Sequence, residues 1–224
     1  MTERKKISHQ ETREQLRKKK LSAIEPITKS HIRVRNKSEL AEIVEGPLLL
    51  SHEILFDKNI QTFMSSANRG VLVGEHPTAD FSINFDALSE SNKEVARKLV
   101  EEKVGELIPG IDVFPSRLNI DIPVSTESTW GEIEDVAVKV VNRFVAQRYM
   151  PEAYSPEFML RRFDYALNED IEGDTVPPEY FERHGFFYDD KSGLFFLSKD
   201  EIEKLYQTVD KENPNEPPKF SKIY

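Results

Sequence analysis

The chain has 224 residues, of which 31 are Lys or Arg, 40 are Asp or Glu and none is Cys. The absence of cysteine excludes disulfide scaffolds, thiolate zinc sites, iron–sulfur clusters and cysteine nucleophiles, and it favours a reducing, cytoplasmic location. No apolar run approaches the roughly 18 residues of a membrane helix, and no apolar stretch follows the basic N-terminus as it does in a secretory signal. We therefore expect no membrane association.

The charge is distributed unevenly along the chain. Residues 1–37 carry 12 Lys or Arg against 4 Asp or Glu, a formal charge of +8, whereas the remaining residues carry 19 against 36, a formal charge of −17. We expect residues 8–22 of an N-terminal arm, 1–30, to form a polar helix that begins with a capping box at Ser8 and Glu11. The basic residues of the arm are Arg13, Arg17, Lys18, Lys19 and Lys20, of which Arg13, Arg17 and Lys20 recur at helical spacing and would form a stripe.

Three interpretations of the arm stay open. The arm is a solvated terminus, or it docks on an acidic surface of the same or a neighbouring chain, or it contacts nucleic acid. It contains no aromatic residue, so it lacks the stacking platform that single-strand binders use. Its apolar content within the predicted helix is only Leu16 and Leu21, which we expect to be too little for firm docking.

Residues 31–150 are predicted to form an α/β sandwich domain. Alternating apolar and charged residues predict an edge strand over 31–36. Capping residues and a proline predict helices over 38–44, where Ser38 is the expected cap, and over 48–58. A brief apolar run then predicts a strand over 60–64.

Two strand-then-helix units follow in this domain. Alternation with a period of two predicts strands over 81–86 and 117–123. Apolar residues repeating at three and four positions predict a helix over 91–108. A second helix is predicted to begin after Thr129, because Glu132 completes a capping box with it.

The element order of residues 31–150 indicates the fold class. Strand, helix, strand, strand, helix, strand, helix is the order of a ferredoxin-like split βαβ unit with an added C-terminal helix. We therefore predict an α+β fold, a two-layer α/β sandwich.

A helix, β-hairpin and helix module is predicted over 151–209. A helix is expected over 155–167, and the last helix begins after Ser198. Between them, Gly193 follows a polar turn that is flanked by aromatic segments, which is a hairpin signal. These aromatic residues form either a small satellite core or an interface with a partner. The tail, 210–224, is expected to be disordered.

Polar residues at the end of the predicted strand 60–64 form the first candidate site. Thr62, Ser65, Ser66, Asn68 and Arg69 offer hydroxyls, an amide and a guanidinium to a small anion such as phosphate or carboxylate. His76 follows and would supply a base if the loop folds back. A plain polar turn explains the same residues.

The polar face of the predicted sheet is the second candidate site. Asn84, Asp86, Asn119 and Asp121, together with Ser82, would point to this face. Paired carboxylates bind hard cations or share acid and base work, but any solvated face needs polar residues. The acidic face is also a candidate docking surface for the basic arm.

The remaining residues indicate no metal and no cofactor. The five histidines, His9, His31, His52, His76 and His184, show no metal-ligand spacing. Trp130, at the start of a predicted helix, is interpreted as a packing residue.

These observations favour a cytosolic, non-catalytic binding or regulatory protein. It would act through protein–protein contacts, with a protein partner or by self-association, and its basic arm would dock on an acidic surface. One alternative is an enzyme or sensor that binds a small anion at the loop 65–69. Another is an accessory nucleic-acid binder that uses the arm.

Overall fold

The protein is described here by a computed structural model, in which two compact units are distinguished. The residues that it describes are 12–23, 27, 34, 36–67, 78–110, 115–157, 159, 160, 178–183, 185–212 and 221–223. The first unit comprises 1–83, 90–107 and 118–146, and the second comprises 84–89, 108–117 and 147–224. Each unit is associated with one four-stranded sheet and with helices, which confirms the predicted α+β class.

The first sheet has the strand order β1-β2-β4-β3, and β1 pairs with β2 in antiparallel orientation. The elements of this part of the chain are α1 (Arg13–Arg17), the 3-10 turn η1 (Leu21–Ala23), α2 (Lys37–Ile43), α3 (Gly46–Asp57), β1 (Thr62–Ser66), β2 (Thr78–Asn84), α5 (Glu90–Glu101), β3 (Gly105–Ile108), β4 (Arg117–Pro123) and α6 (Trp130–Val141).

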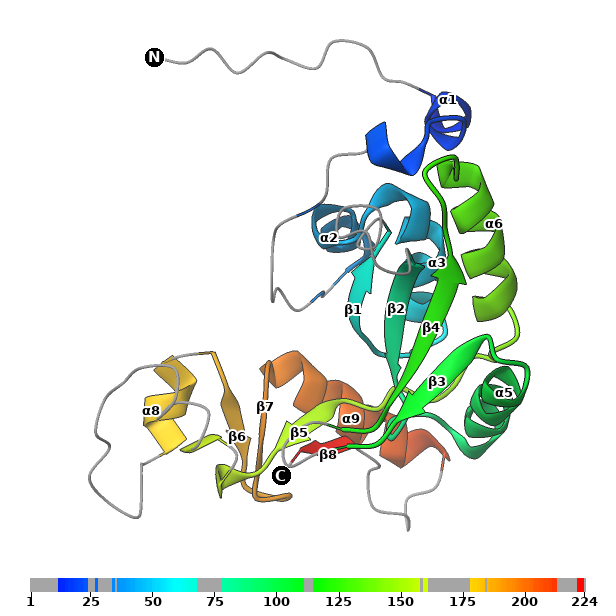
Figure 1. Cartoon of the computed structure of the whole chain (residues 1–224). Helices are drawn as coiled ribbons and strands as arrows, with labels where there is room; N and C mark the ends of the chain where they lie inside the picture. The colour runs from blue at the N-terminus through cyan, green and yellow to red at the C-terminus, as the bar shows by residue number, and fades with distance from the viewer. Residues whose placement is uncertain are drawn as a thin grey trace, which may run out of the picture. The chain divides into compact units, whose positions relative to one another are not determined.

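Helices α3 and α6 lie side by side and contribute to one core with the sheet (Figure 1). The capping box predicted at Thr129 is confirmed, because the Thr129 side chain accepts from the amide of Glu132 and the Glu132 carboxylate accepts from the amide of Thr129. The two helices approach closely at Gly46, where a Cβ atom would lie 2.2 Å from Cη2 of Trp130. Trp130 is thus a packing residue, as predicted.

The predicted helix 91–108 is wrong in its last part. It ends as α5, and Gly105–Ile108 form strand β3 instead. Lys103 adopts a positive φ of 59°, which turns the chain out of the helix. Gly105 then permits a close strand contact, because a Cβ there would lie 2.8 Å from the carbonyl oxygen of Asn119.

The arm helix is shorter than the predicted span 8–22. Thr12 has an extended backbone and caps α1, and Gln15 completes the capping box with it. The capping box predicted at Ser8 and Glu11 lies outside the described residues.

The start of α2 also differs from the prediction. Asn36, and not Ser38, caps this helix, because its side chain accepts from the amide of Glu39. Most of the predicted edge strand 31–36 lies outside the described residues. The ferredoxin-like order is not confirmed, and β3 is an element that the sequence pattern did not predict.

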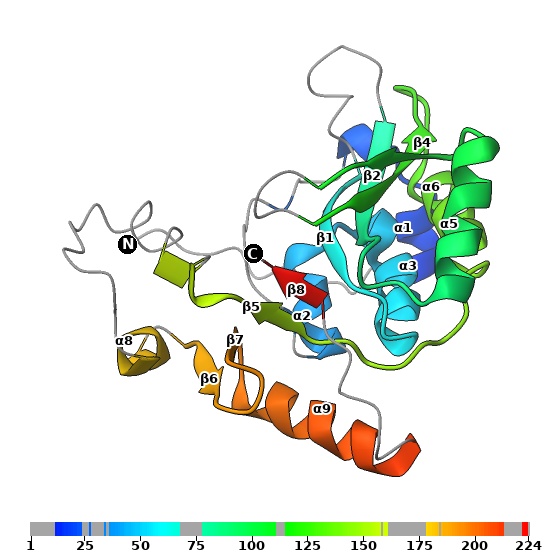
Figure 2. The same ribbon diagram turned by 90° about the horizontal axis from the view of Figure 1, so that it is seen from below.

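The second sheet has the order β6-β7-β5-β8. Figure 2 shows β8 beside β5, with which it pairs in parallel orientation. The elements are β5 (Glu152–Tyr154), α8 (Pro178–Arg183), β6 (Phe187–Asp189), β7 (Leu194–Phe196), α9 (Lys199–Glu212) and β8 (Ser221–Ile223). The predicted hairpin is present as β6 and β7, and Gly193 has the positive φ, 70°, that its turn requires.

The aromatic residues of the second unit form a core. Tyr154, Met159, Phe181, Phe186 and Phe195 are buried together, so the satellite-core interpretation describes these residues. The prediction of disorder over 210–224 is wrong at both ends of that range, since α9 continues to Glu212 and β8 forms near the C-terminus. None of the helices in the described ranges combines the length and hydrophobicity that crossing a membrane requires.

Candidate functional site

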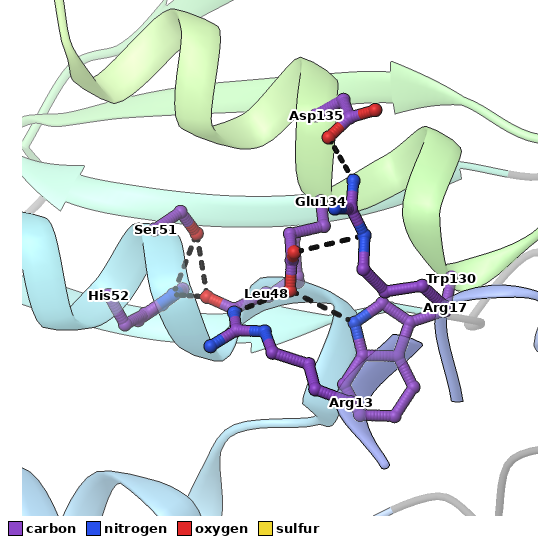
Figure 3. A network of polar contacts seen from close by, with 8 residues as sticks. All are labelled: Arg13, Arg17, Leu48, Ser51, His52, Trp130, Glu134 and Asp135. Carbon is purple, nitrogen blue, oxygen red and sulfur yellow. Dashed lines mark hydrogen bonds and ion pairs between the residues drawn. The ribbon is translucent and has the colours of Figure 1, made fainter. Parts of the chain in front are cut away.

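The basic arm contacts the acidic first turns of α6 (Figure 3). Nη2 of Arg13 lies 2.7 Å from Oε2 of Glu134, and Nε of Arg17 lies 3.3 Å from Oε1 of the same carboxylate. Arg17 also forms an ion pair with Asp135 through Nη2. Spacing of four residues places both arginines on one face of α1, so both reach α6.

The loop before α6 holds the end of the arm. Lys20 forms an ion pair with Glu127, and the amide of Leu21 donates to the carbonyl of Ser128 at 3.0 Å. The Leu21 side chain is only 1% exposed. The arm therefore has one buried apolar anchor, whose burial contributes on the order of 2 kcal/mol, and the expectation that it docks too weakly to be firm stays a prediction.

A second backbone hydrogen bond joins the arm to the helix itself. The amide of Trp130, the first residue of α6, donates to the carbonyl of Lys19 at 2.9 Å. Amides in the first turn of a helix have no acceptor within the helix. The arm supplies that acceptor, so its backbone completes the N-terminus of α6.

Glu134 is the centre of the contact. Its side chain is 3% exposed, and beside the two arginines it accepts a hydrogen bond from Nε1 of Trp130 at 3.2 Å. Trp130 and Glu134 are four residues apart and therefore share a face of α6. We call Glu127, Ser128, Trp130, Glu134 and Asp135 the α6 surface.

The other two basic residues singled out in the arm show different contacts. Lys18 pairs with Glu14 on its own helix, at 3.4 Å, and Lys19 contacts α6 through its backbone carbonyl. The basic stripe is visible in the sequence, but the residues that it contacts are not. Glu134 and Asp135 fit the electrostatic preference for carboxylates at a helix start, so the sequence gives no sign that they also bind the arm.

The polar face predicted for the sheet is not a solvated docking surface along its length. Ser82 and Asn84 are fully buried, so the expectation of exposure is wrong for them. Asn84 accepts from the amide of Ala87, and Asp86 accepts from the amide of Ser116 at 2.8 Å. Asn84 and Asp86 belong to the second unit. Asn84 fixes the turn that follows β2, whereas Asp86 joins this turn to the segment before β4.

Asn119 and Asp121 belong to the first unit. Oδ1 of Asn119 accepts from the Ser82 hydroxyl at 2.7 Å, and its Nδ2 donates to Asp121 at 3.3 Å. Burial, and secondly the negative charge of Glu106, raise the pKa of Asp121. The Ser82–Asn119 bond joins β2 to β4, and the Asn119–Asp121 bond runs along β4.

The strand before the predicted anion loop extends two residues further than the predicted end at residue 64. Thr62, Ser65 and Ser66 lie within strand β1, which pairs with β2. Asn68, Arg69 and His76 lie outside the described residues. The predicted anion site therefore stays a prediction.

Sequence reasoning missed a buried carboxylate next to this strand. Glu45 is buried and accepts from the amide of Ala67. Burial raises the pKa of Glu45, and the hydrogen bond from Ala67 opposes that shift. Glu45 fixes the end of β1 to the start of α3.

Ser51 and His52 form an adjacent serine–histidine pair in α3 (Figure 3). Both donate to the carbonyl of Leu48, at 2.6 Å from the serine Oγ and 2.9 Å from the histidine Nδ1. Both side chains are buried, and the His52 ring packs edge-on against Phe81. Burial lowers the pKa of His52 to about 4, so the ring is neutral at pH 7. The Leu48 carbonyl thus satisfies a donor of each buried side chain.

Within the described ranges, no group of three or more His, Asp or Glu side chains is arranged to hold a metal ion. Comparison of the chain with models of protein families, with curated proteins and with solved structures found no match. The α6 surface and the arm that covers it form the candidate functional site.

Proposed function

We propose that the protein is a non-catalytic binding or regulatory protein that acts through protein–protein contacts, and that the α6 surface is its contact surface. The observation that carries this proposal is the arm itself: a cationic segment already occupies the surface through Glu134, Asp135 and Glu127. The cysteine-free sequence supports a cytoplasmic location for this function.

The docked arm gives the proposed contact a regulatory character. Residues 24–35 connect η1 to the capping residue of α2, so the arm binds its own surface as part of the same molecule and has the advantage of an intramolecular ligand. A partner that uses the same surface must displace the arm. The apparent affinity of the partner equals its affinity for the uncovered surface multiplied by the fraction of molecules in which the arm is not docked.

The proposal is tested with the arm supplied as a separate molecule. The probe is a synthetic peptide of residues 9–23, which contains no tryptophan, and the receptor is the chain without residues 1–23. Trp130 is the only tryptophan of the chain and contacts the arm, so its emission reports binding. We expect saturable binding to the arm-deleted chain and at least about tenfold weaker binding to the full chain.

Two controls make the result specific. A peptide with Arg13→Glu and Arg17→Glu should not bind, because it places carboxylates against Glu134. If the arm-deleted chain does not fold by circular dichroism, the full chain carrying Arg13→Glu and Arg17→Glu serves as receptor, since it retains Leu21. Absence of peptide binding to a folded receptor, or equal binding to the receptor and the wild-type chain, would contradict the proposal.

A further inference from the structure

The buried carboxylate of Glu134 sets a chemical requirement on anything that occupies the α6 surface. The contacts described for this carboxylate are with Arg13, Arg17 and the indole of Trp130. When the arm leaves, the indole N–H stays as a neutral donor, and the two cationic partners are lost. An occupant that replaces the arm covers Glu134 again. A carboxylate buried without a cationic partner is destabilised, so such an occupant must bring positive charge to this position.

The geometry favours guanidinium groups over ammonium groups. Arg17 uses two different nitrogens, with Nε directed at Glu134 and Nη2 at Asp135. A guanidinium presents its donors in a fixed planar fork, whereas an ammonium is a single point charge on a flexible stem. Lysine in place of Arg17 therefore cannot hold both carboxylates in the same manner.

Spacing is the second requirement. Arg13 and Arg17 lie one helical turn apart and reach opposite oxygens of one carboxylate, Oε2 and Oε1. Residues three apart are turned differently around a helix from residues four apart, so a shift of one position directs the second side chain elsewhere. Leu21, buried a further four residues along the chain, adds an apolar anchor that fixes the register.

From these contacts we infer that the α6 surface recognises a partner protein through a basic helical segment with two arginines four residues apart, followed by a leucine four residues after the second arginine. This inference rests on the proposed function and specifies the class of partner. The charge complementarity between the −17 remainder of the chain and its +8 N-terminal region favours a basic partner over an acidic one. Glu134 and Asp135 are the residues that determine specificity.

The test uses the 9–23 peptide with single conservative changes and the arm-deleted chain as receptor. Arg17→Lys should weaken binding by about tenfold, because an ammonium cannot keep the contact with the buried Glu134 while it also pairs with the exposed Asp135. Lys20→Arg should change the affinity less than about twofold, because its partner Glu127 is exposed and accepts either cation. Arginine and lysine have similar helix propensities, so these changes do not alter the helicity of the peptide.

The receptor carries the matching control. With Asp135→Asn in the receptor, the difference in affinity between the unchanged peptide and the Arg17→Lys peptide should shrink, since Asp135 is the second partner of Arg17. Equal affinity of the two peptides for the unaltered receptor would overturn the inference while leaving the proposed function intact. If even the unchanged peptide fails to bind, the proposed function is what fails.

Discussion

Replacing Leu21 by alanine tests how firmly the arm is docked. The side chain is 1% exposed in a short 3-10 turn, and its removal deletes buried methyl groups and leaves a cavity. Leucine-to-alanine changes at such positions cost about 2–5 kcal/mol. We expect about 2–3 kcal/mol here, at the lower end, because the arm lies at an edge of the unit and can relax into the space.

The free energy of unfolding is measured by denaturant titration, followed both by circular dichroism and by the emission of Trp130. Lys18→Ala is the matched control on the same arm: its side chain is 77% exposed and pairs with Glu14 on its own helix, so it should change the unfolding free energy by less than about 0.5 kcal/mol. A loss below about 0.5 kcal/mol for Leu21→Ala as well would refute the claim that the arm is part of the folded unit.

Three further predictions concern other contacts. His52 has a pKa of about 4 in the folded chain against about 6.5 when unfolded, so the free energy of unfolding should fall by about 3 kcal/mol as the pH drops from 6.5 to 4. In His52→Asn the amide replaces the Nδ1 donor, and this part of the pH dependence should flatten. An unchanged slope in that variant would contradict the assignment of the pH dependence to His52. Gly46→Ala places a Cβ 2.2 Å from the indole of Trp130, so it should cost about 1–3 kcal/mol and shift the emission of Trp130; an unshifted spectrum would count against the packing. Tyr206→Phe removes the hydroxyl that donates to Asp189 at 2.6 Å. It should lower the free energy of unfolding by about 1–2 kcal/mol in a denaturant titration, and an unchanged free energy would mean that the contact does not stabilise the second unit.

Local sequence signals are reliable where one short-range interaction decides the structure. The capping box at Thr129 and Glu132, the positive φ at Gly193 and the cap at Ser198 are all predicted correctly, because each depends on neighbours in sequence. The helix predicted over 91–108 fails for the opposite reason. Its apolar repeat continues into a segment that pairs as β3, and pairing with a distant strand is not encoded in the local period.

The arm illustrates the limit of charge patterns. Its basic stripe is visible as Arg13, Arg17 and Lys20, but the acidic residues that receive it also satisfy the ordinary preference for carboxylates at a helix start. Two acceptable explanations for Glu134 and Asp135 leave the docking surface unidentified. Only the fold, which buries Glu134 and brings Arg13 and Arg17 to its carboxylate, distinguishes the two.

The anion loop shows a different limit. The hydroxyls of Ser65 and Ser66 indicate a turn in the sequence, because polar residues follow an apolar run. In the structure both residues continue β1, which is completed when Ala67 donates to the buried Glu45. A glutamate more than twenty positions earlier cannot be recognised as the partner of a strand end from local pattern.

The most direct test of the docked arm is hydrogen exchange at the amide of Trp130. This amide belongs to α6 but donates to the carbonyl of Lys19 in the arm, and a first-turn amide has no acceptor in its own helix. We predict protection in the full chain, at least about tenfold faster exchange in the arm-deleted chain, and recovery when the 9–23 peptide is added. Exchange at the same rate in the full and arm-deleted chains would contradict the account.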